Sequence, residues 1–205
     1  MNRPALAALA AAAALPLTAG PASAELRLPS VFSDHLVLQR DMPAPVWGWA
    51  DPSSEVVVQL AGRTARGTAD AEGRWLVRLE PLPAGGPHEL TVASGDQRVT
   101  LRDVLVGEVW LASGQSNMEW PLRMSDEAEV AIAAADFPTI RLFTVPKAPS
   151  ATPADDAAGG SWRVCSPQTV DDFSAVAFYF GRQLQAELGV PLGLIDATWG
   201  GTPAE

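Results

Sequence analysis

Residues 104–120 have the sequence VLVGEVWLASGQSNMEW, and this stretch decides the fold class of the second half of the chain. Its first part, residues 104–112, is an almost continuous apolar run interrupted only by Gly107 and Glu108. Such a run is typical of a strand that is buried on both faces, as in a parallel sheet. The polar residues that follow are then expected at the carboxyl end of a strand, where open α/β sheets bind their ligands.

The rest of the second half alternates between helical and extended patterns. A short helix is expected before a strand at residues 140–145. Ser174 can cap a stronger helix, whose apolar residues recur at four-residue spacing, and residues 192–197 form another apolar run. Strand, helix, strand, helix, strand predicts the first part of an α/β layered domain over residues 104–205.

Residues 25–103 show short apolar runs separated by turn residues, with no helical period. Residues 46–49 and 56–60 each end at a turn signal, and residues 75–80 partly alternate between apolar and polar. Short strands at this spacing predict a small antiparallel β-sandwich that precedes the α/β domain.

Residues 1–24 have the pattern of a secretory signal peptide. Arg3 supplies the positive start, residues 5–17 the apolar stretch, and Ala22-Ser23-Ala24 the small-residue cleavage site. The apolar stretch is too short to span a membrane as a helix. We therefore expect a periplasmic or secreted protein that has no membrane anchor after cleavage.

The charge and the rare residue types exclude several classes of function. The formal net charge is -10, from 14 basic and 24 acidic residues, which argues against binding to a nucleic-acid backbone. One cysteine and two histidines are too few for an ordinary Cys/His zinc site. Cys165 lacks a nearby histidine in the sequence, so a packed thiol is expected there.

Ser116 is the candidate nucleophile of the opening stretch. A serine at a strand end holds its hydroxyl at the sheet edge, where backbone N–H groups can stabilise an oxyanion. The amides of Gln115 and Asn117 are further donors for the same charge. The alternative is an ordinary strand-end turn, because Ser, Asn and Gly are common turn residues and the Gly-x-Ser-x-Gly elbow is not matched.

Residues 114–121, GQSNMEWP, resemble the nucleophile block of the sialate O-acetylesterase family, which are carbohydrate acetylesterases of the SGNH-hydrolase type. Residues 31–40, VFSDHLVLQR, resemble the family's opening segment, and residues 45–50, PVWGWA, are similar to the strand that follows. Residues 194–205, LIDATWGGTPAE, are similar to a second block. The resemblance spans the chain from about residue 28 to its last residue.

The resemblance implies a flavodoxin-like α/β domain of the SGNH type, on which Ser116 attacks acetyl groups on sugar hydroxyls, with no metal and no organic cofactor. It also implies that the backbone N–H of Ser116 and a glycine N–H from Gly200 or Gly201 stabilise the oxyanion. Trp120, beside the nucleophile, is the candidate platform for a sugar ring, and Glu119 is expected at the rim of the site. Acetylated sialic acids, xylan and other acetylated glycans all fit as substrates.

The family's general-base histidine and its acidic partner lie much later in the chain than residue 205. His35 and His88 both fall in the β-rich half, where a structural role is expected. We therefore expect these 205 residues to be the amino-terminal portion of a longer esterase, with the nucleophile but without the base.

The alternative function is that of a non-catalytic carbohydrate-binding module or fragment. In that case the β-sandwich would bind glycans through exposed tryptophans. A third interpretation makes the first half only a structural support. The exposure of Trp47, Trp49 and Trp75 distinguishes these interpretations, because packed tryptophans belong to a core.

Overall fold

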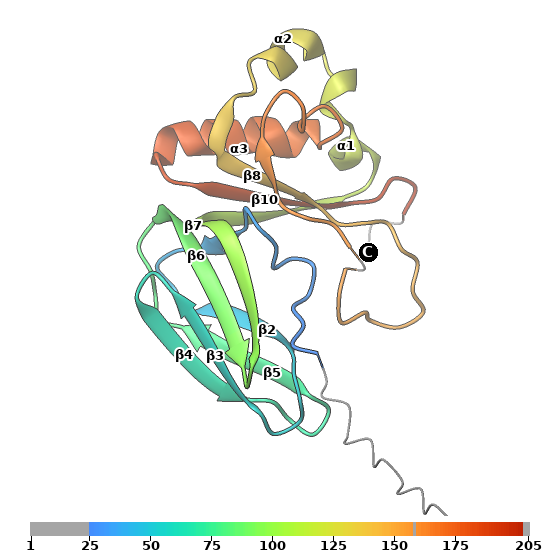
Figure 1. The fold of residues 1–205 in the computed structure, drawn as a ribbon. Coiled ribbons are helices and arrows are strands. Elements are labelled where there is room, and N and C mark those ends of the chain that lie inside the picture. The colour runs from blue at the N-terminus through green and yellow to red at the C-terminus, as the bar shows by residue number, and fades with distance from the viewer. Residues whose placement is uncertain (1–24, 158, 203–205) are drawn as a thin grey trace, which may run out of the picture.

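The computed structural model describes residues 25–157 and 159–202 of the chain (Figure 1). The expected signal peptide at residues 1–24 lies outside the described residues, as do residues 203–205 at the end of the second similar block. No helix among the described residues is long and apolar enough to cross a membrane.

The first half of the described chain is built from short strands, as its turn-rich sequence predicts. In β5 (Arg74–Leu79) every second side chain is buried, which is the alternation of a strand with one face in a core. The other strands of this half are β1 (Val37–Gln39), β2 (Ala44–Trp49), β3 (Glu55–Leu60), β4 (Arg63–Thr68), β6 (Gly85–Ser94) and the start of β7 (Gln97–Gly114).

The second half alternates strands and helices. The helix α3 (Ala175–Leu188) begins where the Ser174 side chain accepts a hydrogen bond from the Ala177 N–H, and it ends at Gly189 in the left-handed conformation. The other elements are α1 (Ser116–Glu119), the short 3-10 helix η1 (Leu122–Met124), α2 (Ala128–Ala133), β8 (Phe137–Thr144), β9 (Arg163–Cys165) and β10 (Leu192–Thr198).

One eight-stranded sheet runs through both halves, in the order β4-β3-β6-β7-β10-β8-β9, with β1 also paired to β7. β7 pairs antiparallel with β6 and, further along, parallel with β10, which is itself parallel to β8. The structure is therefore a mixed α/β fold in which most elements are strands and only a few are helices. The boundary expected between residues 103 and 104 falls inside β7, which continues across it.

The two faces of the parallel strands contact different parts of the molecule. On one face, Leu142 and Leu194 share a hydrophobic core with Phe178 of α3. On the other face, Phe143 and the neighbouring Trp162 belong to the core of the first half. Figure 1 shows the helices on one side of these strands and the β-rich half on the other. The first half thus covers the face that a second helical layer covers in a doubly wound fold.

The two-stranded sheet of β2 and β5 packs against the antiparallel strands. Val46 and Trp75 from this sheet share a core with Val58 of β3. Trp47 lies on the outward face of β2, where it is 37% exposed and contacts Phe32 edge to face at 4.6 Å between ring centroids. Trp75 is therefore a core residue and Trp47 a partly exposed one.

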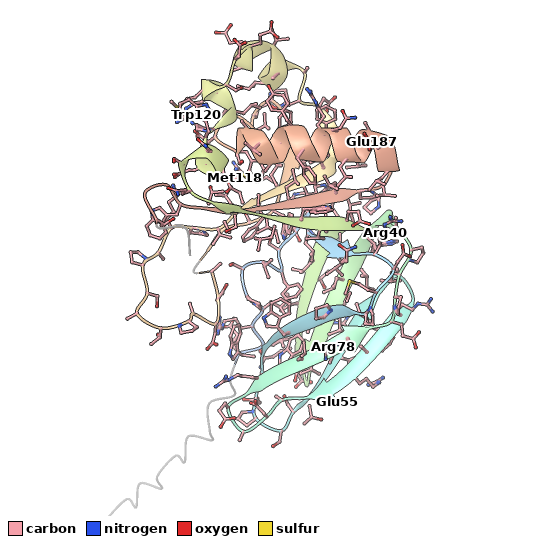
Figure 2. All side chains as sticks on the ribbon, turned by 180° about the vertical axis from the view of Figure 1, so that it is seen from behind. Arg40, Glu55, Arg78, Met118, Trp120 and Glu187 are labelled. Atoms are coloured by element: carbon pink, nitrogen blue, oxygen red, sulfur yellow. The ribbon has the colours of Figure 1, made fainter. Side chains whose placement is uncertain are left out.

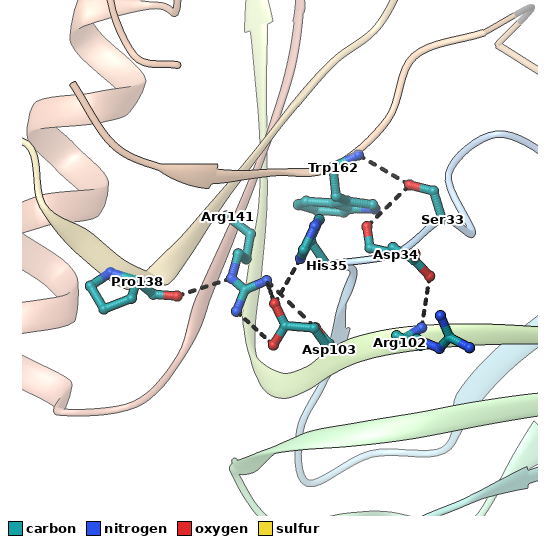
Figure 3. Close-up of polar contacts among 8 residues, drawn as sticks. All are labelled: Ser33, Asp34, His35, Arg102, Asp103, Pro138, Arg141 and Trp162. Atoms are coloured by element: carbon teal, nitrogen blue, oxygen red, sulfur yellow. Dashed lines mark hydrogen bonds and ion pairs between the residues drawn. The ribbon is translucent and has the colours of Figure 1, made fainter. Parts of the chain in front are cut away.

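Asp103 ties the two halves together at the point where β7 passes between them. Its carboxylate accepts hydrogen bonds from the Arg141 guanidinium at 2.6 and 3.1 Å and lies 2.7 Å from His35 Nδ1 (Figure 3). Hydrogen bonding by Arg141, opposed by burial and assisted by His35, lowers the pKa of Asp103. His35 has the structural contact expected for it, and His88 lies on β6, opposite Val104 of β7.

Candidate active site

A sharp turn at the end of β7 presents Ser116. Gly114 has a φ of +138°, and a Cβ atom on it would lie 2.9 Å from Met118 Cγ, so the turn requires glycine. The Gln115 carbonyl accepts hydrogen bonds from the N–H groups of Met118 and Glu119, both at 2.9 Å, and closes the single turn of α1. Ser116 is the first residue of this turn and is exposed.

The loop after β10 lies beside this turn, because β10 and β7 are parallel neighbours and their carboxyl ends meet at the same edge of the sheet. The Trp199 N–H donates a hydrogen bond to the Gly114 carbonyl at 2.9 Å. A Cβ atom on Gly200 would lie only 3.7 Å from Ser116 Cα. The structure therefore brings the two blocks that were singled out in the sequence into contact.

A cavity of about 440 Å³ opens at this edge. Of the site residues expected from sequence, Ser116 and Trp120 line it. Gln115 and Asn117 are exposed and do not line it, and neither do Gly200 and Gly201 in the adjacent loop. Its lining comes from the ends of β7, β8 and β10 and from the start of the helical layer: Ser116, Glu119, Trp120, Pro121, Arg123, Met124, Thr144, Lys147, Asp172, Asp196 and Thr198.

Trp120 is 47% exposed on the wall of this cavity. Its indole Nε1 donates a hydrogen bond to the Met124 carbonyl at 2.9 Å, which restrains the ring. Figure 2 shows Trp120 and Met118 close together on the segment that follows β7, near one end of α3. A restrained and partly exposed indole is suited to stacking on a sugar ring.

The start of α3 holds the nucleophile turn in place. The buried Ser174 hydroxyl donates a hydrogen bond to the Met118 carbonyl at 2.6 Å, and the Ala175 N–H donates to the Trp120 carbonyl at 2.8 Å. The sequence predicts Ser174 as the cap of α3, but its second contact, with α1, joins residues far apart in the chain and gives no local signal.

The charged side chains of the cavity all have partners within the protein, which are opposite charges or hydrogen-bond donors. The Lys147 ammonium pairs with Glu119, and the Arg123 guanidinium pairs with Asp172. Asp196 is buried, and its Oδ1 accepts hydrogen bonds from the N–H and the hydroxyl of Thr198 at 3.1 and 2.7 Å. Each charged group that lines the cavity therefore already has a partner within the protein.

No histidine lines the cavity. His35 and His88 both lie along the earlier part of β7, whereas Ser116 follows its far end. The thiol of Cys165 is buried, and burial raises its pKa to about 12, so it is not a reactive thiolate. Among the described residues, no group of three or more His, Cys, Asp or Glu is placed to hold a metal ion.

No family model matches the chain. The chain is 32% identical to the sialate O-acetylesterase of Mus musculus, in an alignment that covers 87% of this chain and 37% of that protein. It is 31% identical to the sialate O-acetylesterase of Homo sapiens, over 87% of this chain and 38% of that protein. A carbohydrate acetylesterase structure from Xanthomonas citri is 44% identical, with a TM-score of 0.84 over 87% of this chain and 41% of that chain. The chain thus spans less than half the length of these relatives.

Proposed function

We propose that this chain, a homologue of the sialate O-acetylesterases over 87% of its length, carries the nucleophile of a carbohydrate O-acetylesterase. The observation that supports this most directly is the position of Ser116. Ser116 follows the carboxyl end of a parallel strand, lines the cavity of about 440 Å³ and lies against the loop that contains Gly200. Acyl transfer needs this combination of an exposed hydroxyl, nearby peptide donors and room for a substrate.

The proposed reaction has two steps. The Ser116 hydroxyl attacks the acetyl carbonyl carbon, the bond from that carbon to the sugar oxygen breaks, and the sugar leaves with a proton. Water then hydrolyses the acetyl-serine ester and releases acetate. The peptide N–H of Ser116 and one peptide N–H of the Gly200-Gly201 pair stabilise the oxyanion in both steps. Neither histidine of the chain lines the cavity, so neither is assigned as the acceptor of the Ser116 proton.

We propose the same two units for the chain as the sequence predicts. The first, residues 25–103, is a β-sandwich, supported by the packing of the β2–β5 sheet on the antiparallel strands. The second, residues 104–205, is an SGNH-type α/β domain, supported by the parallel strands β7, β10 and β8. The signal-peptide pattern of residues 1–24 supports a periplasmic or secreted location.

A second candidate function is glycan binding by the first unit. The partly exposed Trp47 lines a groove of about 410 Å³ together with Leu76, Asp70 and Arg74. An indole next to polar groups is suited to a sugar ring. If this groove binds glycans, Trp47→Ala weakens retention on a xylan affinity gel while Ser116→Ala does not. Equal retention of wild type and Trp47→Ala would exclude it.

The test of the esterase proposal is acetate release by the full-length protein from acetylated xylan and from O-acetylated sialic acid. Ser116→Ala is expected to lower the rate by about 10³-fold or more, as for other serine hydrolases that lose the nucleophile. Ser113→Ala is the matched control, because Ser113 is an exposed serine near the end of β7 that does not line the cavity. Equal activity of Ser116→Ala and Ser113→Ala would exclude Ser116 as the nucleophile.

A further inference from the structure

Glu119 joins three segments that meet at the candidate nucleophile. It is the last residue of α1 and lies three positions after Ser116. Its Oε2 accepts a hydrogen bond from the Gly200 N–H, in the loop after β10, and its Oε1 pairs with the Lys147 ammonium, in the segment after β8. The carboxylate therefore connects the carboxyl-end segments of all three parallel strands.

The loop after β10 passes close to α1 at Gly200. A Cβ atom there would overlap Glu119 Oε2 and would lie 3.7 Å from Ser116 Cα, which is ordinary van der Waals contact. A side chain at this position would therefore displace the Glu119 carboxylate from the Gly200 N–H. The Glu119 carboxylate thus holds the loop directly against the backbone of the nucleophile.

The hydrogen bond between Glu119 and the Gly200 N–H determines which peptide N–H of the loop can still donate to a substrate. The Gly200 N–H is bound to a carboxylate, which is a stronger acceptor than the carbonyl of an ester substrate. The next residue, Gly201, has a φ of +80°, and its N–H has no hydrogen-bond acceptor among the described residues. The free donor of the glycine pair is therefore that of Gly201.

We propose that Glu119 is a positioning residue of the esterase site. By binding the Gly200 N–H it fixes the loop so that the Gly201 N–H, rather than that of Gly200, is the peptide donor available to the oxyanion at Ser116. Lys147 balances the charge of Glu119, which otherwise would repel the negative oxygen that develops at the same place. This proposal rests on the proposed esterase function.

The test compares the steady-state kinetics of full-length Glu119→Ala, Glu119→Gln and Lys147→Met. Glu119→Ala is expected to lower kcat about 100-fold with little change in KM, because misplacing a donor by about 1 Å costs that much. Glu119→Gln keeps an amide oxygen for the Gly200 N–H, so it is expected to restore kcat to within about 10-fold of wild type. Its pH profile of kcat should match that of wild type, since Glu119 transfers no proton.

The matched control is Glu129→Ala, an exposed glutamate on α2 that does not line the cavity. A kcat of Glu119→Ala equal to that of this control would overturn the proposal. So would a Glu119→Ala variant in which only KM rises, and so would a Glu119→Gln variant as slow as Glu119→Ala. If Glu119→Ala fails to fold, the Lys147→Met variant provides the test. Its kcat is expected to fall below that of wild type, and a kcat equal to wild type would overturn the proposal. Wild type and Ser116→Ala are assayed beside them, and equal acetate release by those two would refute the esterase function instead.

Discussion

Cys165 is a buried thiol at the end of β9, in the core beneath α3. Burial, with a smaller contribution from Asp136, raises its pKa to about 12, so the thiol is protonated at neutral pH. We expect no reaction with a disulfide reagent at pH 8 in the native protein and one equivalent after unfolding. Absorbance of the released thiolate measures this, and rapid labelling of the native protein would contradict it.

At the residue scale, the strand end predicts an exposed Ser116, and Trp120 follows it closely in the chain. That the glycine pair lies at the same site is what the family resemblance implies. Sequence reasoning placed Glu119 only at the rim of the site. The contacts of Glu119 with Gly200 and Lys147 join residues distant in the chain. Gln115 and Asn117 were expected as oxyanion donors from their types alone, and the structure places their side chains outside the cavity lining.

At the element scale, β7 has an open edge. Beyond Gly107, where the pairing with β1 ends, the described residues supply no strand to the side of β7 opposite β10. Leu111 on this stretch is 66% exposed, and Trp110 beside it is also exposed. An apolar unpaired strand edge is a site at which chains associate.

We therefore expect residues 25–205, produced alone, to self-associate with rising concentration, and Leu111→Lys to shift the sedimentation profile towards monomer. A lysine on an edge strand opposes pairing by its charge. Leu188→Lys is the matched control, since Leu188 is an exposed leucine at the end of α3 and not on a strand edge. The same monomer fraction in wild type and Leu111→Lys would argue against association through this edge.

The strands of both halves could be predicted from alternation, apolar runs and turn residues. The continuity of β7 could not, because Arg102 and Asp103 interrupt its apolar pattern and Asp103 takes a left-handed backbone. The change of pattern after residue 103 predicts a boundary between two units. In the structure β7 continues through this point, where the Asp103 carboxylate accepts hydrogen bonds from the Arg141 side chain of β8.

At the scale of the whole molecule, Asp103 and Arg141 hold the two halves together. Arg141 is 4% exposed, so Asp103→Asn leaves a buried guanidinium without its counter-charge. We expect a loss of about 1–2 kcal/mol in the free energy of unfolding at pH 7, which is less than for a fully buried ion pair because the Asp103 side chain is 33% exposed. Denaturant unfolding measures this loss, with Asp96→Asn, on an exposed turn, as the control.

The same pair predicts how stability depends on pH. The pKa of Asp103 is lowered in the folded state, chiefly by the hydrogen bond from Arg141. The ionised carboxylate therefore stabilises the folded state fully above its ordinary pKa of about 4. This stabilisation is lost as the pH falls through the lower pKa of the folded state. The stability difference between wild type and Asp103→Asn should therefore shrink as the pH falls below about 4. A difference that stays constant down to the acid unfolding of wild type would contradict this.

Trapping the acetyl-enzyme tests directly whether Ser116 is the nucleophile. The full-length protein is mixed with acetylated xylan or O-acetylated sialic acid, quenched in acid during turnover, digested and analysed by mass spectrometry. We expect the peptide containing Ser116 to carry one acetyl group and the same peptide of Ser116→Ala to carry none. Acetyl transfer to another residue, or turnover that persists in Ser116→Ala, would contradict it.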